Sequence, residues 1–218
     1  MDCIIKSGVK SYLDNLIERY PQLQPCKPSI VRVYMLLREC YSHGGKILTA
    51  GNGGSAADAE HIVGELMKSF KCARPLSPDM KERILQIDLE RGSRIIDNLE
   101  QPLPAISLVT HEALTTAFLN DVGADSVFAQ QVLGYGKPKD IFLGISTSGN
   151  SENVLEAAVT ARALGLTVIG LTGENGGKLK KYCHECITVP ETETFKIQEL
   201  HLPVYHCLCS MIENEFFG

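Results

Sequence analysis

The sequence predicts an α/β fold, a three-layer sandwich with a five-stranded, mainly parallel sheet and an N-terminal helical extension. Two observations predict it. Five short runs rich in β-branched and other apolar residues are spread along the chain. The segments between them include stretches with the apolar spacing of an amphipathic helix. Strands that alternate with helices in this way form βαβ units, whose sheet is parallel and covered by helices.

The expected strands are short apolar runs bounded by glycine, proline or polar residues. They read "GGKILTAG", "PAISLVT", "DIFLGIST", "LTVIGLTG" and "CITVP". Apolar side chains at helical spacing predict helices over residues 3–20, 28–43, 55–70, 150–164 and 195–217. Ligands of such sheets bind beyond the carboxyl ends of the strands, so the residues that follow the strands are the first candidates for a site.

Residues 1–218 are expected to form a single domain, to which residues 1–44 contribute the N-terminal helices. Residues 77–101, "SPDMKERILQIDLERGSRIIDNLEQ", are charged and helix-like. They interrupt what would otherwise be a short link between a helix and a strand. This helical insertion could be a surface arm, an oligomer contact or a flap over the site.

Composition limits the classes of partner. The net charge of −5 gives no electrostatic reason to bind nucleic acid or an anionic membrane. No stretch approaches the roughly 20 apolar residues that cross a bilayer, and the N-terminus lacks the features of a signal peptide. The eight cysteines include one C-x-x-C pair, Cys183 and Cys186, without the second pair that a zinc knuckle needs. We therefore expect reduced thiols in a cytoplasmic protein.

Two glycine- and serine-rich loops follow predicted strands. "GNGGS" comes after the strand that ends at Ala50, and "STSGNS" after the strand that ends at Ile145. Glycine lets the backbone turn sharply and approach a ligand closely, and the N–H groups at the start of the next helix attract an anion. Neither loop has the spacing of a nucleotide-binding motif, and either alone could simply cap a helix. Two such loops at the same end of one sheet favour a site for a phosphate monoester.

A histidine and a carboxylate follow the first loop. His61 and Glu65 are four residues apart in the predicted helix, so their side chains share a face. Such a pair can be a plain surface interaction, and a single histidine is more often a core residue than a ligand. Its position about two turns after the loop favours a functional site. The C-terminal helix carries Gln198, His201 and His206, and spacing alone does not choose between its two histidines.

Four separated segments resemble those of the sugar isomerase (SIS) domains, and more closely those of the phosphoheptose isomerases. They are "GNGGSAADAEH" followed by "GE", then "GISTSGNSENV", "LTGENGGKL" and "IQELHLPVYH". The resemblance extends over nearly the whole chain except residues 77–101. It implies a zinc-dependent aldose–ketose isomerase that converts sedoheptulose 7-phosphate to D-glycero-D-manno-heptose 7-phosphate through an enediol intermediate. It also implies a homotetramer with sites at the subunit interfaces.

The same resemblance assigns roles to site residues. In the family pattern Q-E-x-H-x-x-x-x-H the glutamine and the last histidine are ligands, so the implied zinc ligands are His61, Glu65, Gln198 and His206. Glu65 would be the base and His206 the partner acid or base, zinc would act as a Lewis acid, and His201 would be structural. The residues implied to bind the sugar phosphate are Asn52, Gly53, Gly54, Ser55, Glu65, Asn120, Asp121, Ser146, Thr147, Ser148, Ser151 and Gln198.

Asn120 and Asp121 match a family segment that contacts substrate hydroxyls, although without the resemblance they would be interpreted as a turn.

Other positions differ from the family pattern. Pro203 precedes His206 by three residues and would kink the helix and re-aim that histidine. Ser69 stands where relatives often have an arginine that holds the substrate. These differences weaken the assignment of the sugar more than that of the reaction.

Two alternative functions remain open at this point. The same metal site would serve an isomerase of another sugar phosphate. The fold is also that of the DiaA type of protein, which binds the replication initiator without catalysis. Proteins of that type lack the carboxylate and the terminal histidine of the metal site, whereas this chain has Glu65 and His206.

Overall fold

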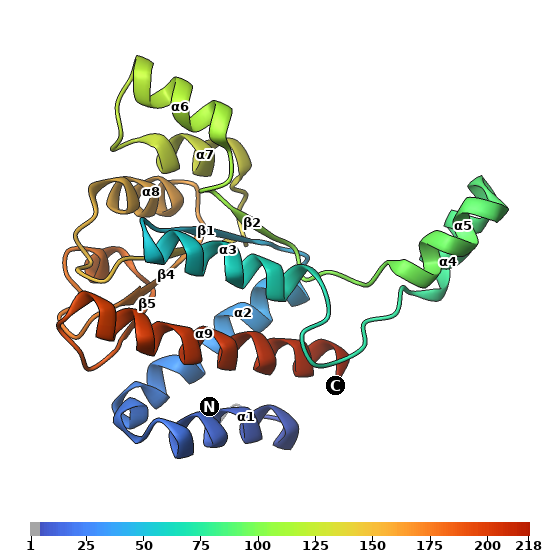
Figure 1. The fold of residues 1–218 in the computed structure, drawn as a ribbon, viewed down its shortest axis with the longest axis horizontal. Helices are drawn as coiled ribbons and strands as arrows, with labels where there is room; N and C mark the ends of the chain where they lie inside the picture. The colour runs from blue at the N-terminus through green and yellow to red at the C-terminus, as the bar shows by residue number, and fades with distance from the viewer. Residues whose placement is uncertain (1–4) are drawn as a thin grey trace.

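The computed structural model describes residues 5–218, which form an α/β sandwich around one sheet (Figure 1). All five strands are parallel and lie in the order β2-β1-β3-β4-β5. Their bounds are Ile47–Ala50 (β1), Ala105–Ser107 (β2), Ile141–Ile145 (β3), Thr167–Thr172 (β4) and Glu185–Thr188 (β5). The predicted fold class is confirmed, and the sheet is entirely rather than mainly parallel.

Helices cover both faces of this sheet (Figure 1). The first face is covered by α2 (Lys27–Ser42), α3 (Gly54–Met67) and α9 (Thr194–Phe217), with α1 (Ser7–Arg19) packed on α9. The second face is covered by α7 (Val127–Tyr135) and α8 (Glu152–Ala163), with α6 (Glu112–Asp121) beyond α7. Two short 3₁₀ helices are η1 (Pro21–Cys26) and η2 (Leu179–Tyr182).

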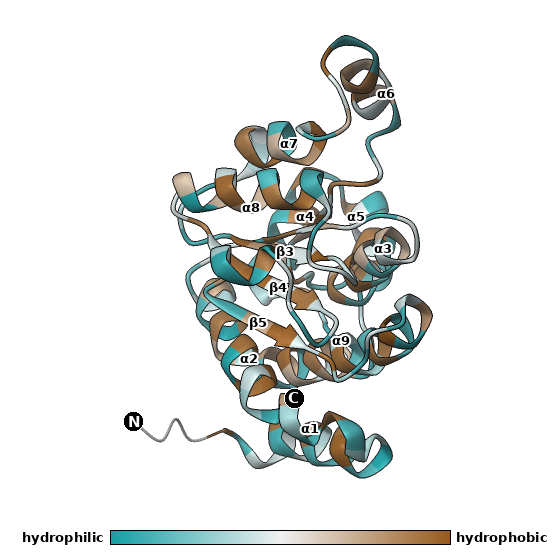
Figure 2. Ribbon diagram, turned by 90° about the vertical axis from the view of Figure 1, so that its left-hand side faces the viewer, coloured by the Kyte–Doolittle hydropathy of each residue, from teal (hydrophilic) through white to brown (hydrophobic). Residues whose placement is uncertain are grey.

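The two faces of the sheet have separate apolar cores, because successive residues of a strand point to opposite sides. Ile47 of β1 pairs with Ile141 of β3, and both lie in the core that α2, α3 and α9 cover. Leu48 and its partner Phe142 lie in the core under α7 and α8. Figure 2 shows the strands mostly brown between helices that carry teal on their outer sides. The central strands are therefore buried on both faces, as their continuous apolar sequences predict.

The insertion forms a helical hairpin that projects from the body of the molecule, as Figure 1 shows. It consists of α4 (Pro78–Ile87) and α5 (Leu89–Asn98), which pack on each other. At the crossing, a Cβ atom on Gly92 would lie 3.1 Å from the carbonyl oxygen of Ile84, so glycine permits the close approach. In one chain the hairpin is an arm on the surface, and its roles as an oligomer contact or as a flap over the site stay predictions.

Two predicted helices differ by three or more residues at one end from those observed. The helix expected over 3–20 is observed from Ser7, and residues 1–4 lie outside the described part of the chain. The helix expected over 55–70 ends at Met67, and Lys68 is extended with φ −137° and ψ 176°. The reason is tertiary, because the backbone after Lys68 binds a buried carboxylate of α9 that is described below.

The structure places three of the residues discussed above. Asn120 and Asp121, which without the resemblance would be interpreted as a turn, belong to the last turn of α6. Pro203 lies inside α9, which runs from Thr194 to Phe217, and its kink stays a prediction. Within residues 5–218, no helix has both the length and the apolar composition needed to cross a membrane.

Candidate active site

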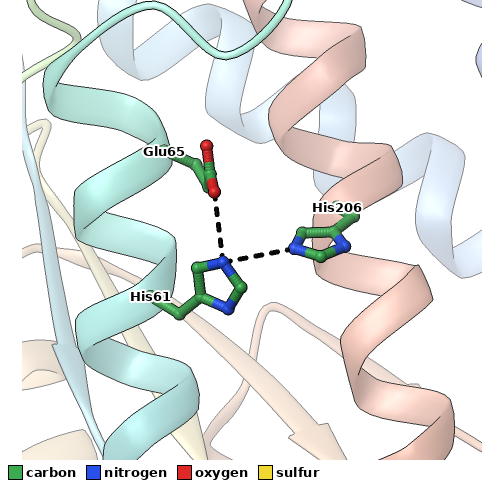
Figure 3. Close-up of side chains that lie close together, drawn as sticks. All are labelled: His61, Glu65 and His206. Atoms are coloured by element: carbon green, nitrogen blue, oxygen red, sulfur yellow. Dashed lines mark hydrogen bonds and ion pairs between the residues drawn. The ribbon is translucent and has the colours of Figure 1, made fainter.

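Two helices that are distant in sequence bring together two imidazoles and a carboxylate (Figure 3). α3 contributes His61 and Glu65, and α9, which packs beside it, contributes His206. His61 Nε2 lies 3.1 Å from Glu65 Oε1 and 3.5 Å from His206 Nε2. One ligand atom from each of the three residues lies within 4.8 Å of the others. The predicted His–Glu pair thus meets the last histidine of the C-terminal helix, despite Pro203.

These three side chains form a group that could hold a metal ion. Burial and the neighbouring His61 lower the pKa of His206, so its imidazole is held neutral, as a metal ligand must be. Glu65 Oε2 is buried without a hydrogen-bond partner in the described structure, and Lys68 Nζ is 4.0 Å away. Two nitrogen ligands and one carboxylate are the kind of donor set that binds a transition metal.

The second ring nitrogen of His61 also has a partner. The hydroxyl of Tyr205 lies 2.9 Å from His61 Nδ1 and donates to Asp58 Oδ1 at 3.3 Å. Tyr205 is 2% exposed. The sequence analysis missed Asp58 and Tyr205. Asp58 could have been found from its place three residues before His61, on the same helical face, whereas nothing in the sequence pairs Tyr205 with α3.

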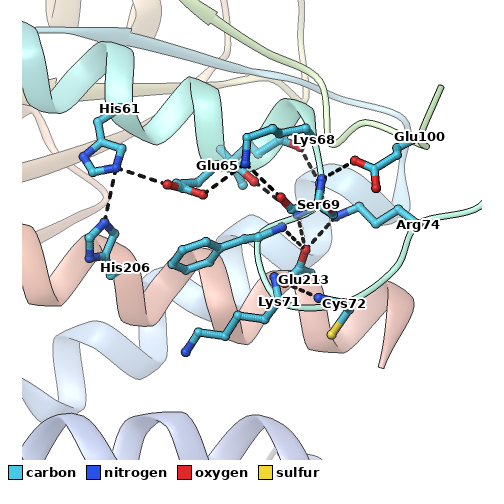
Figure 4. A network of polar contacts seen from close by, with 12 residues as sticks. His61, Glu65, Lys68, Ser69, Lys71, Cys72, Arg74, Glu100, His206 and Glu213 are labelled. Carbon is cyan, nitrogen blue, oxygen red and sulfur yellow. Dashed lines mark hydrogen bonds and ion pairs between the residues drawn. The ribbon is translucent and has the colours of Figure 1, made fainter. Parts of the chain in front are cut away.

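A buried ion pair holds the end of α3 against α9 (Figure 4). Arg74 and Glu213 are 1% and 0% exposed, and Arg74 Nη2 lies 2.7 Å from Glu213 Oε1. Arg74 also donates to the carbonyl oxygens of Glu65 and Leu66, at 3.1 and 2.6 Å. These carbonyls lack partners within the helix because α3 ends there. The ion pair therefore fixes the helical turn that carries Glu65, and sequence analysis did not find it.

Glu213 also organises the loop after α3. Its carboxylate accepts hydrogen bonds from the backbone N–H groups of Phe70, Lys71 and Cys72, at 2.7, 2.7 and 3.1 Å. The ring of Phe70 consequently lies 5.5 Å from that of His206, between centroids. One buried carboxylate therefore places the side chain that covers one side of His206.

The two predicted phosphate loops lie at the same edge of the sheet. They follow β1 and β3, which pair at Ala50 and Gly144. Asn52 of the first loop and Asn153 of α8 exchange two side-chain hydrogen bonds, of 2.9 and 3.0 Å. Ser146 and Ser151 share a hydrogen bond of 3.0 Å between their hydroxyl groups. Sequence analysis missed Asn153, which joins the two loops.

Glycine is required at two positions of these loops. Gly53 precedes α3 with φ 55°, a conformation that side chains disfavour. Gly149 has φ 64°, and a Cβ atom there would lie 2.2 Å from the carbonyl oxygen of Gly176. The "GGK" segment of the third motif thus packs directly on the second loop. Among the other predicted phosphate contacts, Ser55 and Ser146 are buried, Ser148 is exposed, and Thr147 and Ser151 are half-buried.

The side chain of Gln198, a residue of α9, lies against the first residue of α3. A Cβ atom on Gly54 would lie 2.5 Å from the side-chain nitrogen of Gln198, so Gly54 makes room for this amide. Gln198 thereby joins the first loop to α9, and its role as a zinc ligand stays a prediction. Asn120 and Asp121 are exposed at the end of α6, bonded to each other at 2.9 Å, and their contact with the sugar also stays a prediction.

His201 is enclosed in the core. Its side chain is 0% exposed, and neither ring nitrogen has a hydrogen-bond partner in the described residues. Burial lowers the pKa of His201 to about 4.

His201 should make the free energy of unfolding depend on pH. The unfolded chain takes up a proton on His201 as the pH falls below about 6.5, whereas the native protein does so only near pH 4. The free energy of unfolding should therefore decrease by about 2 kcal/mol between pH 7 and pH 5 from this group alone. Urea unfolding of wild type and His201→Asn at both pH values measures it. An equally steep decrease in the variant would contradict the assignment.

Comparisons with known proteins agree with the motifs and the geometry. A family model described as SIS domain matches residues 11–95 and 96–173. A phosphoheptose isomerase of Rhodospirillum rubrum is 37% identical over 210 residues, which cover 96% of this chain and 98% of that protein. One of Aneurinibacillus thermoaerophilus is 39% identical over 217 residues, which cover 100% and 96%. The structure of a phosphoheptose isomerase from Francisella tularensis has a TM-score of 0.74 and 32% identity, over 94% of this chain and 96% of that one. The chain belongs to the phosphoheptose isomerase family of SIS-domain enzymes.

Proposed function

We propose that this enzyme is a zinc-dependent isomerase that converts sedoheptulose 7-phosphate to D-glycero-D-manno-heptose 7-phosphate. The observation that carries the proposal is the convergence of His61, Glu65 and His206 from α3 and α9. The first predicted phosphate loop leads into the same α3, and the second leads into α8 and is joined to the first through Asn52 and Asn153. Gln198 of α9 lies against Gly54, the first residue of α3. The names of the relatives support the sugar, and the donor set supports the metal.

The chemistry needs a base, a second proton carrier and a phosphate anchor. Glu65 would take the proton from carbon 1 of the ketose and return it to carbon 2 through an enediol. His206 would exchange the proton between the two oxygens. The N–H groups and hydroxyls of the loops after β1 and β3 would hold the phosphate. Zinc held by His61, Glu65 and His206, with Gln198 as a further ligand, would supply positive charge to the sugar oxygens.

Removal of the metal tests this proposal. Treatment with EDTA is expected to lower turnover of sedoheptulose 7-phosphate at least about tenfold, because the oxygens lose their positive partner. Added zinc should restore the rate, whereas added calcium, which prefers a larger set of oxygen ligands, should not. Metal analysis of the same sample gives the stoichiometry. An unchanged rate after complete removal of bound metal would contradict the zinc assignment.

Metal analysis and a wider set of substrates separate the alternative functions. Assays of ketose and aldose phosphates of five to seven carbons would reveal an isomerase of another sugar. A DiaA-like binding protein would show neither bound zinc nor turnover of any of them. The presence of Glu65 and His206 in one cluster favours the enzyme.

We also propose a homotetramer in the cytoplasm. The hairpin of α4 and α5 exposes large apolar side chains, with Ile87 86% and Leu89 74% exposed, and assembly would cover them. Light scattering tests whether the protein is a tetramer.

The cytoplasmic location is proposed from the cysteine content, and cell fractionation tests this location.

A further inference from the structure

We propose that Tyr205 and Asp58 are positioning residues that fix the tautomer of His61, so that its Nε2 atom presents a lone pair to the ligand cluster. The inference rests on the proposed metal site and concerns residues outside the implied set of ligands. The proposal is based on a chain of two contacts. The Tyr205 hydroxyl lies 3.3 Å from Asp58 Oδ1 and 2.9 Å from His61 Nδ1.

The direction of each hydrogen bond follows from counting protons. A phenol has one proton to give and oxygen lone pairs that accept. The carboxylate of Asp58 only accepts, so the Tyr205 proton points toward Asp58. The Tyr205 oxygen can then only accept from His61 Nδ1, which must carry the N–H. A neutral imidazole has one such proton, and Nε2 is therefore left with a free lone pair.

The location of Tyr205 makes this arrangement rigid. Its side chain is 2% exposed, and its ring meets that of His61 edge to face, with 5.5 Å between centroids. It is the residue immediately before His206, so a single turn of α9 supplies both one ligand and the orientation of another. Asp58 and His61 lie three residues apart on α3, so the acceptor of the tyrosine proton is fixed to the same helix as the histidine.

The arrangement works against another hydrogen bond. Glu65 Oε1 lies 3.1 Å from His61 Nε2 and, without a metal, would favour a proton on that nitrogen. Such a proton would have to leave before a cation could bind. The Asp58–Tyr205 pair biases the ring toward the other tautomer and so lowers the free-energy cost of metal binding. Partners of this kind are typically worth 10- to 100-fold in metal affinity.

Zinc affinity is the first readout. Tyr205→Phe removes the hydroxyl and keeps the ring, and we expect zinc to bind about 10- to 100-fold more weakly in a chelator competition. Tyr34→Phe is the matched control, because Tyr34 is 0% exposed and its hydroxyl donates to Glu215 at 2.9 Å, in a different contact. Equal affinities of wild type and Tyr205→Phe would overturn the proposal.

Asp58→Leu gives an independent arm of the test. Without the carboxylate, the Tyr205 proton can turn to His61 Nδ1 and force the proton onto Nε2, so this variant should also lose zinc affinity although Tyr205 is intact. The double variant should lose little more than either single variant, since both act through one chain of hydrogen bonds. Additive losses would show two separate structural effects and would overturn the inference.

The tautomer itself is measurable without metal. In the metal-free protein, ¹⁵N NMR of the histidine rings should show His61 with its proton on Nδ1 in wild type and a larger share on Nε2 in Tyr205→Phe. The same tautomer in both proteins would overturn the proposal even if the zinc affinities differed. Failure of wild type to bind zinc would instead contradict the proposed function, and the NMR result would still decide the role of Tyr205.

Discussion

Glu65→Gln is expected to lower kcat for sedoheptulose 7-phosphate by about 1,000-fold or more, while the protein stays folded. One carboxylate oxygen of Glu65 lies 3.1 Å from Nε2 of His61 on the same helix. The second oxygen is buried without a hydrogen-bond partner in the described residues, so it is available to act as a base. Glutamine has nearly the same shape, so the core is kept and the base is removed. Turnover, urea unfolding and zinc content would be measured on the same preparation.

The zinc content separates the two roles proposed for Glu65. A variant that still binds zinc and does not turn over has lost a base, whereas one without zinc has lost a ligand. Glu60→Gln is the matched control, since Glu60 is an exposed carboxylate on the same helix. It should retain the wild-type rate. If Glu65→Gln retained that rate as well, proton transfer by Glu65 would be wrong.

Glu213→Gln is expected to destabilise the fold by about 3–5 kcal/mol, the usual cost of breaking a buried ion pair by removing one partner. The guanidinium of Arg74 would remain in a site that is 1% exposed without its counter-charge. The three N–H groups of the loop after α3 would also lose a charged acceptor. Urea unfolding at pH 7 measures the free energy.

An ion pair with an exposed arginine provides the control for this prediction. Arg32 and Glu185 also form a pair, in which the arginine side chain is 59% exposed and the glutamate side chain 14% exposed. Glu185→Gln leaves the arginine charge in water, so it should cost at most about 1 kcal/mol. The double variant Arg74→Met with Glu213→Leu should recover only the part of the loss that comes from the unpaired guanidinium. The three N–H groups after α3 and the carbonyls of Glu65 and Leu66 would still lack these partners. Similar costs for Glu213→Gln and Glu185→Gln would contradict the structural role given to the buried pair.

The sequence predicts the parts of this enzyme that local patterns determine. β-Branched runs and glycine loops identify the strands and the turns after them, and the i, i+4 rule places His61 beside Glu65. Contacts between residues that are distant in sequence cannot be predicted from such local patterns. Arg74 and Glu213 are 139 residues apart, and Tyr205 and His61 are 144 apart.

Nothing local distinguishes such residues from others. A buried arginine looks like a surface arginine until its partner is known, and a tyrosine in an apolar helix looks like a core residue. The last histidine of α9 was selected by resemblance and not by spacing. The end of α3 at Met67 was mispredicted for the same reason, since the carboxylate that stops the helix comes from near the C-terminus.

α3 begins at the first predicted phosphate loop and carries two of the proposed catalytic and metal-binding residues, so its length would set the distance between the two ends of the substrate. From Gly54 at its first turn to His61 there are seven residues, or about 10 Å along the axis at 1.5 Å per residue. A sugar anchored by its phosphate at one end of that distance must be an open chain long enough to present its carbonyl at the other. Under the proposed function, this distance along the helix would favour sugars long enough to span it.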